Sequence, residues 1–326
     1  MTRTLSSSAG AHVVCAGVVV ADVFVPPLLR LPEPGELVVT EDFVVETGGC
    51  AANAGIALAR LGVRPTVVAR VGDDLFGDFV EQELSAAAVD VSGIARTPGL
   101  GTSKTVIVPV SGDDRRYVHT FGANAALCAA DIEPAIATPP DVLYVGGFLV
   151  LPALRQDELA GQLRGARRSG TRVVLDVVAP AGRALSSDDV AGLLPDVDYF
   201  VPNDDEAAAL TGERDPRRQV ERLRELGAGT VIVTMGDRGV IAGSADGMIE
   251  LPAPRVEVVE PSGAGDAFAA GLVYGLLEDW ALPRSLEFAS MMGASACTRL
   301  GCTAGLPTRA EADAQLERQA RCPSPR

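Results

Sequence analysis

The sequence of 326 residues has only one lysine, Lys104, and its formal net charge is -15 at pH 7. A strongly acidic surface repels phosphate groups, so nucleic acids and anionic membranes are excluded as partners. A Walker A loop needs Gly-Lys-Ser/Thr after a glycine-containing run, whereas Lys104 follows Ser103. A nucleotide bound by this chain must therefore be held by backbone amides and a metal ion, without a P-loop lysine.

Cysteines and histidines are also few and scattered. The six cysteines include no Cys-x-x-Cys pair, and the only histidines are His12 and His119. This spacing lacks the motifs of a disulfide framework or a structural zinc site and is typical of reduced cytoplasmic thiols. The apolar run 13–29 is interrupted by Asp22 and a Pro-Pro pair, which makes it too short to span a membrane. With no recognisable export leader, we expect a cytoplasmic protein.

One stretch carries a clear chemical signal, namely Glu-Pro-Ser-Gly-Ala-Gly-Asp-Ala-Phe at 260–268. The proline and glycines predict a helix that begins at about Ala264 or Gly265. The amides of Gly263, Ala264 and Gly265 would then form an anion hole that suits a phosphoryl group. A carboxylate at Asp266 makes sense there as the base for a hydroxyl that attacks phosphorus. The alternative is an ordinary helix start with an acidic first turn.

The order of apolar segments predicts the fold. From Asp141 onward, short apolar strands alternate with helical segments, which indicates a doubly wound, mostly parallel α/β sheet with helices on both faces. No repeat or linker divides the chain, so we expect a single domain at 12–307. Two β-prone segments, 36–46 and 103–121, predict a small separate sheet. A flexible tail is expected at 1–11, and a helix with a tail at 308–326.

A second glycine pair opens an alanine-rich helix at 46–62, in Glu-Thr-Gly-Gly-Cys-Ala-Ala-Asn-Ala-Gly. Together with the 260–268 stretch, it resembles the paired signatures of the ribokinase-like (PfkB) carbohydrate kinases, and the likeness extends from about residue 13 to 307. The resemblance implies transfer of the ATP γ-phosphoryl group to a carbohydrate hydroxyl, with Mg²⁺. It also implies that the small sheet is a β-lid that closes over the sugar and pairs with a second subunit in a homodimer.

Substrate contacts are expected beyond the first strand and at the first glycine pair. The valine-rich run 13–20 is typical of a buried parallel strand, and ligands bind beyond the carboxyl ends of such strands. The positions that match the family or lie beside its motif are Asp22, Gly48, Gly49, Asn53 and Asn124. Capping roles for Asp22 and Asn53, and a turn role for Asn124, are the alternatives.

The metal and nucleotide positions follow from the same resemblance. The family's Asn-x-x-Glu motif is matched by Asn203 and Glu206, which implies that they hold Mg²⁺ and its water shell over the phosphates. A capping box is the alternative for this pair. The positions assigned to the nucleotide are Thr234, Gly236, Gly239 and Ser290.

The sequence departs from the family pattern at several sites. Cys50 stands where some relatives have lysine, which favours a neutral substrate over a phosphorylated one. Ser290 replaces an asparagine in the adenine region. Glu260 and Ser262 replace aspartate and threonine at a loop that in the family helps form a monovalent-cation site, so potassium activation is an open expectation.

Three other functions compete with a carbohydrate kinase. A nucleoside kinase would use the same machinery plus an aromatic slot for the base, for which the candidates are Phe24, Phe43, Phe121 and Phe148. A non-catalytic sugar or nucleotide sensor would gain nothing from a base beside an anion hole. A dinucleotide oxidoreductase would need Gly-x-Gly-x-x-Gly after an early strand, which the late Gly-Ala-Gly does not supply.

Overall fold

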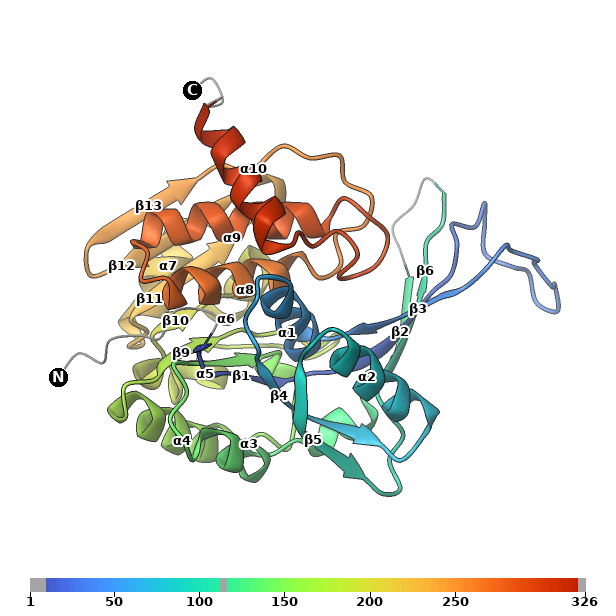
Figure 1. The fold of residues 1–326 in the computed structure, drawn as a ribbon, viewed down its shortest axis with the longest axis horizontal. Coiled ribbons are helices and arrows are strands. Elements are labelled where there is room, and N and C mark those ends of the chain that lie inside the picture. Colours follow the sequence, from blue (N-terminus) through green and yellow to red (C-terminus); the bar gives the residue numbers. More distant parts are fainter. Residues whose placement is uncertain (1–9, 112–115, 322–326) are drawn as a thin grey trace.

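The computed structural model describes residues 10–111 and 116–321 and contains two β-sheets (Figure 1). The larger sheet lies between two layers of helices, and the smaller sheet projects from one end of it. This is the predicted α/β architecture with a separate small sheet, and that expectation is confirmed. Among the described residues, no helix is both long and apolar enough to cross a bilayer.

The larger sheet has nine strands in the described chain, and seven neighbouring strands of it, β11 to β5, are parallel. Strands β12 and β13 extend one edge in antiparallel order. In spatial order the strands are β13 (Gly247–Leu251), β12 (Val240–Ser244), β11 (Thr230–Thr234), β10 (Tyr199–Phe200), β9 (Arg172–Leu175), β8 (Val142–Gly146), β1 (Val13–Gly17), β4 (Thr66–Gly72) and β5 (Asp90–Thr97).

Each face of this sheet has its own apolar core, because strands buried on both sides carry valine, leucine and isoleucine at successive positions. One core is covered by α1 (Cys50–Arg60), α2 (Leu75–Ala86), α8 (Ala264–Leu277) and α9 (Leu282–Ala296). The other is covered by α3 (Ala129–Ile136), α4 (Gln156–Arg168), α5 (Asp188–Ala191), α6 (Asp204–Thr211) and α7 (Pro216–Glu225). Figure 1 shows the two helix layers above and below the sheet.

The smaller sheet forms the lid and has the order β3-β2-β6-β7. Its strands are β2 (Val20–Phe24), β3 (Val44–Gly48), β6 (Lys104–Val108) and β7 (Arg116–Thr120). The expected lid segment 103–121 is confirmed as strands, with residues 112–115 outside the described chain. The other expected segment, 36–46, is largely wrong, because only its last residues belong to a strand and 34–43 form a projecting loop.

The valine-rich run after residue 12 does not form the single strand that the sequence predicted. It is divided between two sheets, with β1 in the larger sheet and β2 in the lid. The chain leaves the larger sheet at Gly17, whose φ is +145° and whose backbone packs so closely on Gly146 that a Cβ would lie 2.1 Å from its carbonyl oxygen. Asp22 therefore lies within a lid strand and does not follow a strand of the larger sheet.

The two chain ends differ from their predicted boundaries. Residues 1–9 of the predicted N-terminal tail lie outside the described residues, whereas Ala11 is only 8% exposed and belongs to the core. The predicted C-terminal helix is confirmed as α10 (Arg309–Arg321), and residues 322–326 lie outside the described chain.

Candidate active site

A cavity of about 160 Å³ opens at the carboxyl edge of the larger sheet. Because carboxyl ends of parallel strands and amino ends of the following helices meet at this edge, it gathers polar groups from distant parts of the chain. Its walls come from the starts of α1, α6 and α8 and from the ends of β9 and β11. Residues on these walls include Cys50, Asp176, Asn203, Glu206, Thr234, Gly263, Ala264, Gly265 and Asp266.

Asp266 lies in the first turn of α8 and is held by one strong partner. The Nδ2 group of Asn53 donates to Asp266 Oδ2 over 2.7 Å. Asn53 is 3% exposed, and its Oδ1 has no hydrogen-bond partner among the described residues. Burial raises the pKa of Asp266, while hydrogen bonds from Asn53 and Cys50 oppose the rise. The arrangement orients a carboxylate and leaves a buried acceptor, Asn53 Oδ1, without a donor among the described residues.

The start of α8 has the form of an anion site. The helix begins at Ala264, as predicted, and Gly263 before it has φ +78°. A Cβ at Gly263 would lie 2.5 Å from the carbonyl oxygen of Cys302, so only glycine fits there. The amides of Gly263 and Gly265 have no partner in the described chain, whereas that of Ala264 donates to Pro261 over a long 3.3 Å. Two of the three predicted amides are therefore free, and the third is weakly engaged.

Asp176 is a site residue that the sequence reasoning missed. It follows β9 directly and accepts a hydrogen bond from the Tyr144 hydroxyl at 3.2 Å. The ligand atoms of Cys50, Asp176 and Asp266 all lie within 4.8 Å of one another. Burial, with Glu206 and Asp266 nearby, raises the pKa of Asp176 well above its usual value. The available signal was its position, a carboxylate at the carboxyl end of an apolar strand.

Asn203 and Glu206 form a capping box at the start of α6. The Glu206 amide donates to Asn203 Oδ1 at 2.8 Å, and the Asn203 amide donates to Glu206 Oε2 at 2.9 Å. This alternative from the sequence is therefore present, yet both residues also line the cavity with Asp266. Burial raises the pKa of Glu206 to about 7, opposed by backbone hydrogen bonds and supported by the charge of Asp266.

Asp22 is buried in the lid next to the first glycine pair. It is 6% exposed, and burial raises its pKa to about 6, against hydrogen bonds from Thr105 and Cys302. A Cβ at Gly48 would lie 1.9 Å from Asp22 Oδ2, so glycine lets this carboxylate pack on the backbone. Gly49 has φ +92°, and a Cβ on it would lie 2.6 Å from the Val18 carbonyl oxygen. Both predicted glycines are thus required by close packing beside Asp22.

Asn124 has a different role from the predicted one. Its Nδ2 donates to the Val19 carbonyl at 2.8 Å, and its Oδ1 accepts from the Val19 amide at 3.3 Å. The side chain is fully buried, and both ends of the amide are used. We therefore correct this assignment: Asn124 fixes the backbone where the chain passes from β1 to β2, a contact with distant residues that the sequence did not indicate.

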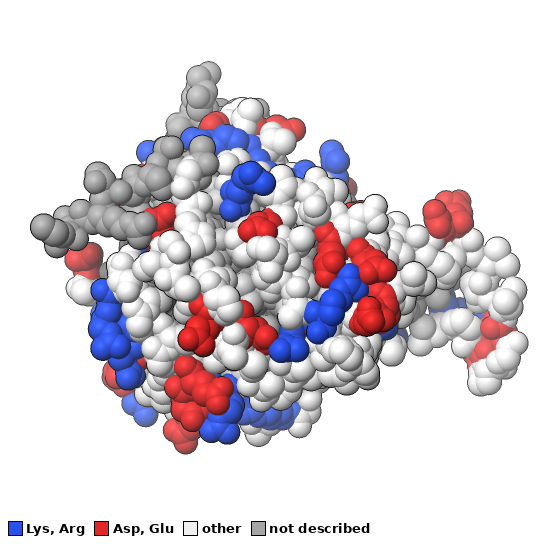
Figure 2. Space-filling model, turned by 60° about the horizontal axis from the view of Figure 1, so that its bottom comes forward, with Lys and Arg blue, Asp and Glu red and all other residues white. Residues whose placement is uncertain are grey.

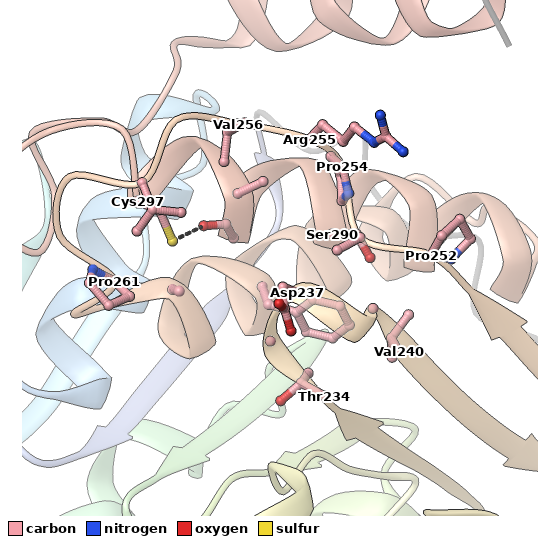
Figure 3. A pocket seen from close by; sticks show the side chains of 18 of the residues that line it. Thr234, Asp237, Val240, Pro252, Pro254, Arg255, Val256, Pro261, Ser290 and Cys297 are labelled. Atoms are coloured by element: carbon pink, nitrogen blue, oxygen red, sulfur yellow. Dashed lines mark hydrogen bonds between the residues drawn. The ribbon is translucent and has the colours of Figure 1, made fainter. Parts of the chain in front are cut away.

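A second cavity of about 750 Å³ adjoins the first, with which it shares Thr234, Pro261, Ala264 and Gly265. All four positions predicted to contact the nucleotide line it, namely Thr234, Gly236, Gly239 and Ser290. Figure 3 shows Thr234 at one wall, Asp237 near the middle and Ser290 on α9 opposite. The sequence reasoning missed the segment 252–258, which forms another wall with mostly apolar side chains and Arg255.

Comparisons with known proteins show the family to which the chain belongs. The profile of the pfkB family carbohydrate kinases matches residues 11–309. The chain is 27% identical to the ribokinase of Haemophilus influenzae over 286 residues, which is 86% of this chain and 90% of that one. It is 31% identical to the aminoimidazole riboside kinase of Salmonella typhimurium over 272 residues, covering 80% and 84% of the two chains.

Structural similarity extends over the same region. The structure of Arabidopsis thaliana ribokinase complexed with ribose and ATP matches 94% of this chain and 98% of its own, with a TM-score of 0.79 at 23% identity. The fold is thus that of the ribokinase-like kinases. The chain belongs to the pfkB family of carbohydrate kinases and is an ATP-dependent phosphotransferase.

Proposed function

We propose that this protein transfers the γ-phosphoryl group of ATP to a hydroxyl of a neutral sugar or sugar-like polyol, with Asp266 as general base. The observation that carries the proposal is the position of Asp266. Its carboxylate is oriented by Asn53, lies beside the free amides of Gly263 and Gly265, and lines the cavity that adjoins the larger one. A base and an anion hole on a cavity that adjoins a nucleotide-sized one fit in-line phosphoryl transfer.

In this mechanism, the acceptor hydroxyl loses its proton to Asp266 while its oxygen forms a bond to the γ-phosphorus. The bond from that phosphorus to the bridging β–γ oxygen breaks, and ADP leaves. The amides of Gly263 and Gly265 stabilise the charge on the transferring group. Asn203 and Glu206 lie where they can bind the water shell of Mg²⁺, which neutralises phosphate charge when it is bound with ATP.

The charge of the site supports a neutral acceptor. Four acidic side chains gather in the region, namely Asp22, Glu46, Asp176 and Glu206, and burial raises the pKa of each of them. Cys50 supplies no positive charge where some relatives have lysine. A phosphate already on the sugar would meet these acids without a cation to offset them.

A nucleoside kinase is the second candidate, favoured by the 31% identity to the aminoimidazole riboside kinase. Of the aromatic residues considered for a base slot, Phe24 and Phe148 are buried in apolar clusters. Phe43 and Phe121 are 54% and 44% exposed in the lid region and are open to a base. A sensor without catalysis is the least favoured, because it gives no reason to orient Asp266 with Asn53.

The lid also suggests a partner. Many of the exposed large apolar side chains of the described residues lie in the lid strands and their loops, including Leu37, Val39, Phe43, Tyr117 and Val118. Figure 2 shows the projecting lid as a largely uncharged arm, whereas the body on the face shown carries acidic and basic groups intermixed. We propose that a second copy of the chain covers this arm in a homodimer. Because ATP is an intracellular metabolite, we place the activity in the cytoplasm.

The proposal is tested by ATP consumption over a panel of free sugars, polyols, cyclitols, nucleosides and sugar phosphates. The assay contains Mg²⁺ and is run with and without potassium, because Glu260 and Ser262 depart from the family's cation loop. Asp266→Asn should retain the Asn53 contact yet reduce turnover of the best acceptor by roughly 10²- to 10⁴-fold. Asp246→Asn, an exposed carboxylate in the β12–β13 turn, is the matched control.

Three outcomes of these assays lead to different conclusions. Loss of turnover in Asp266→Asn alone, with an unchanged melting temperature, supports the general base. Near-normal turnover in that variant contradicts the mechanism. A strong response to nucleosides and none to free sugars would replace the first candidate with the second.

A further inference from the structure

Three side chains that can bind a metal ion meet at one wall of the smaller cavity. Cys50 is the first residue of α1, Asp176 follows β9, and Asp266 lies in the first turn of α8. Their Sγ and carboxylate oxygen atoms lie within 4.8 Å of one another, although the residues are far apart in the sequence. The proposed transfer reaction uses Asp266 and assigns no step to Cys50 or Asp176.

The cavity around this cluster lacks positive charge. Glu206 lines it as a further acid, and no lysine or arginine is found among its described lining residues. A second observation points to a ligand. Asn53 is 3% exposed, its Nδ2 contacts Asp266, and the Oδ1 of the same amide has no hydrogen-bond partner in the described chain. A water molecule bound to a cation at the cluster would supply the missing donor.

We propose that Cys50, Asp176 and Asp266 form a binding site for one thiophilic divalent cation, such as Zn²⁺ or Cd²⁺, which inhibits the kinase by occupying its general base. Binding forms bonds from the cation to the thiolate sulfur and to one oxygen of each carboxylate, and the thiol proton is released to solvent. Only the inhibitory consequence depends on the proposed kinase mechanism. The binding site itself stands on the geometry.

The geometry suits such an ion. Zinc bonds of about 2.0–2.3 Å in tetrahedral order place ligand atoms roughly 3.3–3.8 Å apart, so small side-chain movements close the present cluster. Thiolate is a soft ligand that selects such metals, whereas Mg²⁺ prefers oxygen ligands and retains its water. The cluster shares its cavity with Asn203 and Glu206, the residues proposed for Mg²⁺, and differs from them in offering a thiolate ligand.

The first test measures binding without turnover. Cd²⁺ is titrated into the whole protein, and the ultraviolet charge-transfer absorption of a thiolate–Cd²⁺ bond is recorded. We expect one equivalent to produce the band in the wild-type protein and Cys50→Ser to lose the band and at least tenfold in affinity. Cys128→Ser, a half-buried thiol at the start of α3, should behave as the wild type. An unchanged titration in Cys50→Ser, or no saturable band in the wild type, overturns the site.

The second test uses the acceptor found in the activity panel. Zn²⁺ at micromolar concentration, with Mg-ATP saturating, should inhibit the wild type, and a chelator should restore the rate. Relative to each variant's own uninhibited rate, Cys50→Ser should need at least tenfold more Zn²⁺ for half inhibition. Equal sensitivity of the two proteins overturns the inhibitory role. If no acceptor is phosphorylated, the kinase proposal fails, and the Cd²⁺ titration still decides the site.

Discussion

Replacement of Gly265 by alanine separates stability from catalysis at the start of α8. Gly265 is the second residue of the helix and is exposed, and a Cβ built on it meets no heavy atom within 4 Å. Alanine loses less backbone entropy than glycine when a helix forms, by about 0.5–1 kcal/mol. Gly265→Ala should therefore leave the free energy of unfolding unchanged or raise it by up to that amount.

The same change should damage phosphoryl transfer. The methyl group would enter open space at a residue that lines both cavities. A phosphoryl group kept away from the free Gly265 amide loses one donor of the anion hole. Loss of one such donor lowers turnover by roughly 10²–10³-fold, equivalent to about 3–4 kcal/mol of transition-state stabilisation. Stability and activity are thus expected to move in opposite directions.

The assay combines denaturant unfolding with the initial rate of ATP-dependent phosphorylation. Gly161→Ala is the matched control, because Gly161 lies within α4 and its Cβ would also meet nothing within 4 Å. The control should gain similar stability and keep its full rate. A normal rate in Gly265→Ala would show that the amide of residue 265 does not face the transferring group, and the anion-hole assignment would have to be abandoned.

Two further predictions concern the lid. Burial raises the pKa of Asp22 from 3.8 to about 6, so its contribution to stability is present below pH 4 and is lost as the pH rises through 6. The unfolding free energy of Asp22→Asn relative to wild type should therefore rise between pH 4 and pH 7, by at most roughly 3 kcal/mol, as measured by urea titration; a constant difference would contradict the shift. Val118→Asp, at a position 69% exposed on β7, should convert the proposed dimer to monomers in sedimentation, whereas Leu75→Asp, 83% exposed outside the lid, should leave the mass unchanged.

The predictable parts of the fold are those whose boundaries are set by nearby residues in the sequence, such as proline, glycine and short apolar runs. Gly263 and the proline before it fix the start of α8, because a left-handed glycine and a proline both interrupt the preceding chain. The alternation from residue 141 onward predicted the parallel sheet, since each strand is a short apolar run between helices. The positions predicted to contact the nucleotide line one cavity because they end or follow β11 or lie on α9, at one edge of the sheet.

Other features depend on tertiary contacts that no short stretch encodes. Strands β1 and β2 are both buried and valine-rich, so composition does not show that they belong to different sheets. Only Gly17 marks the point at which the chain leaves the larger sheet. A glycine is needed there because the backbone of the distant Gly146 packs against it. The inward orientation of Asn124 toward Val19 joins residues 105 positions apart. Asp176 was not selected because a carboxylate after a strand is informative only once its neighbours are known.

The placement of Asp22 in the lid changes how acceptor binding relates to catalysis. Cys302 contacts three parts of the site: its thiol donates weakly to Asp22, its amide donates to Glu46 of β3, and its carbonyl lies against Gly263. A hydroxyl that binds Asp22 therefore acts on a lid strand that is connected through one residue to the start of the anion hole. Because the lid carries Asp22 and the body carries Asp266, the acceptor bridges the two when both carboxylates contact it. Under the proposed assignment of Asp22 as an acceptor contact, the position of the lid would set the orientation of the acceptor toward Asp266.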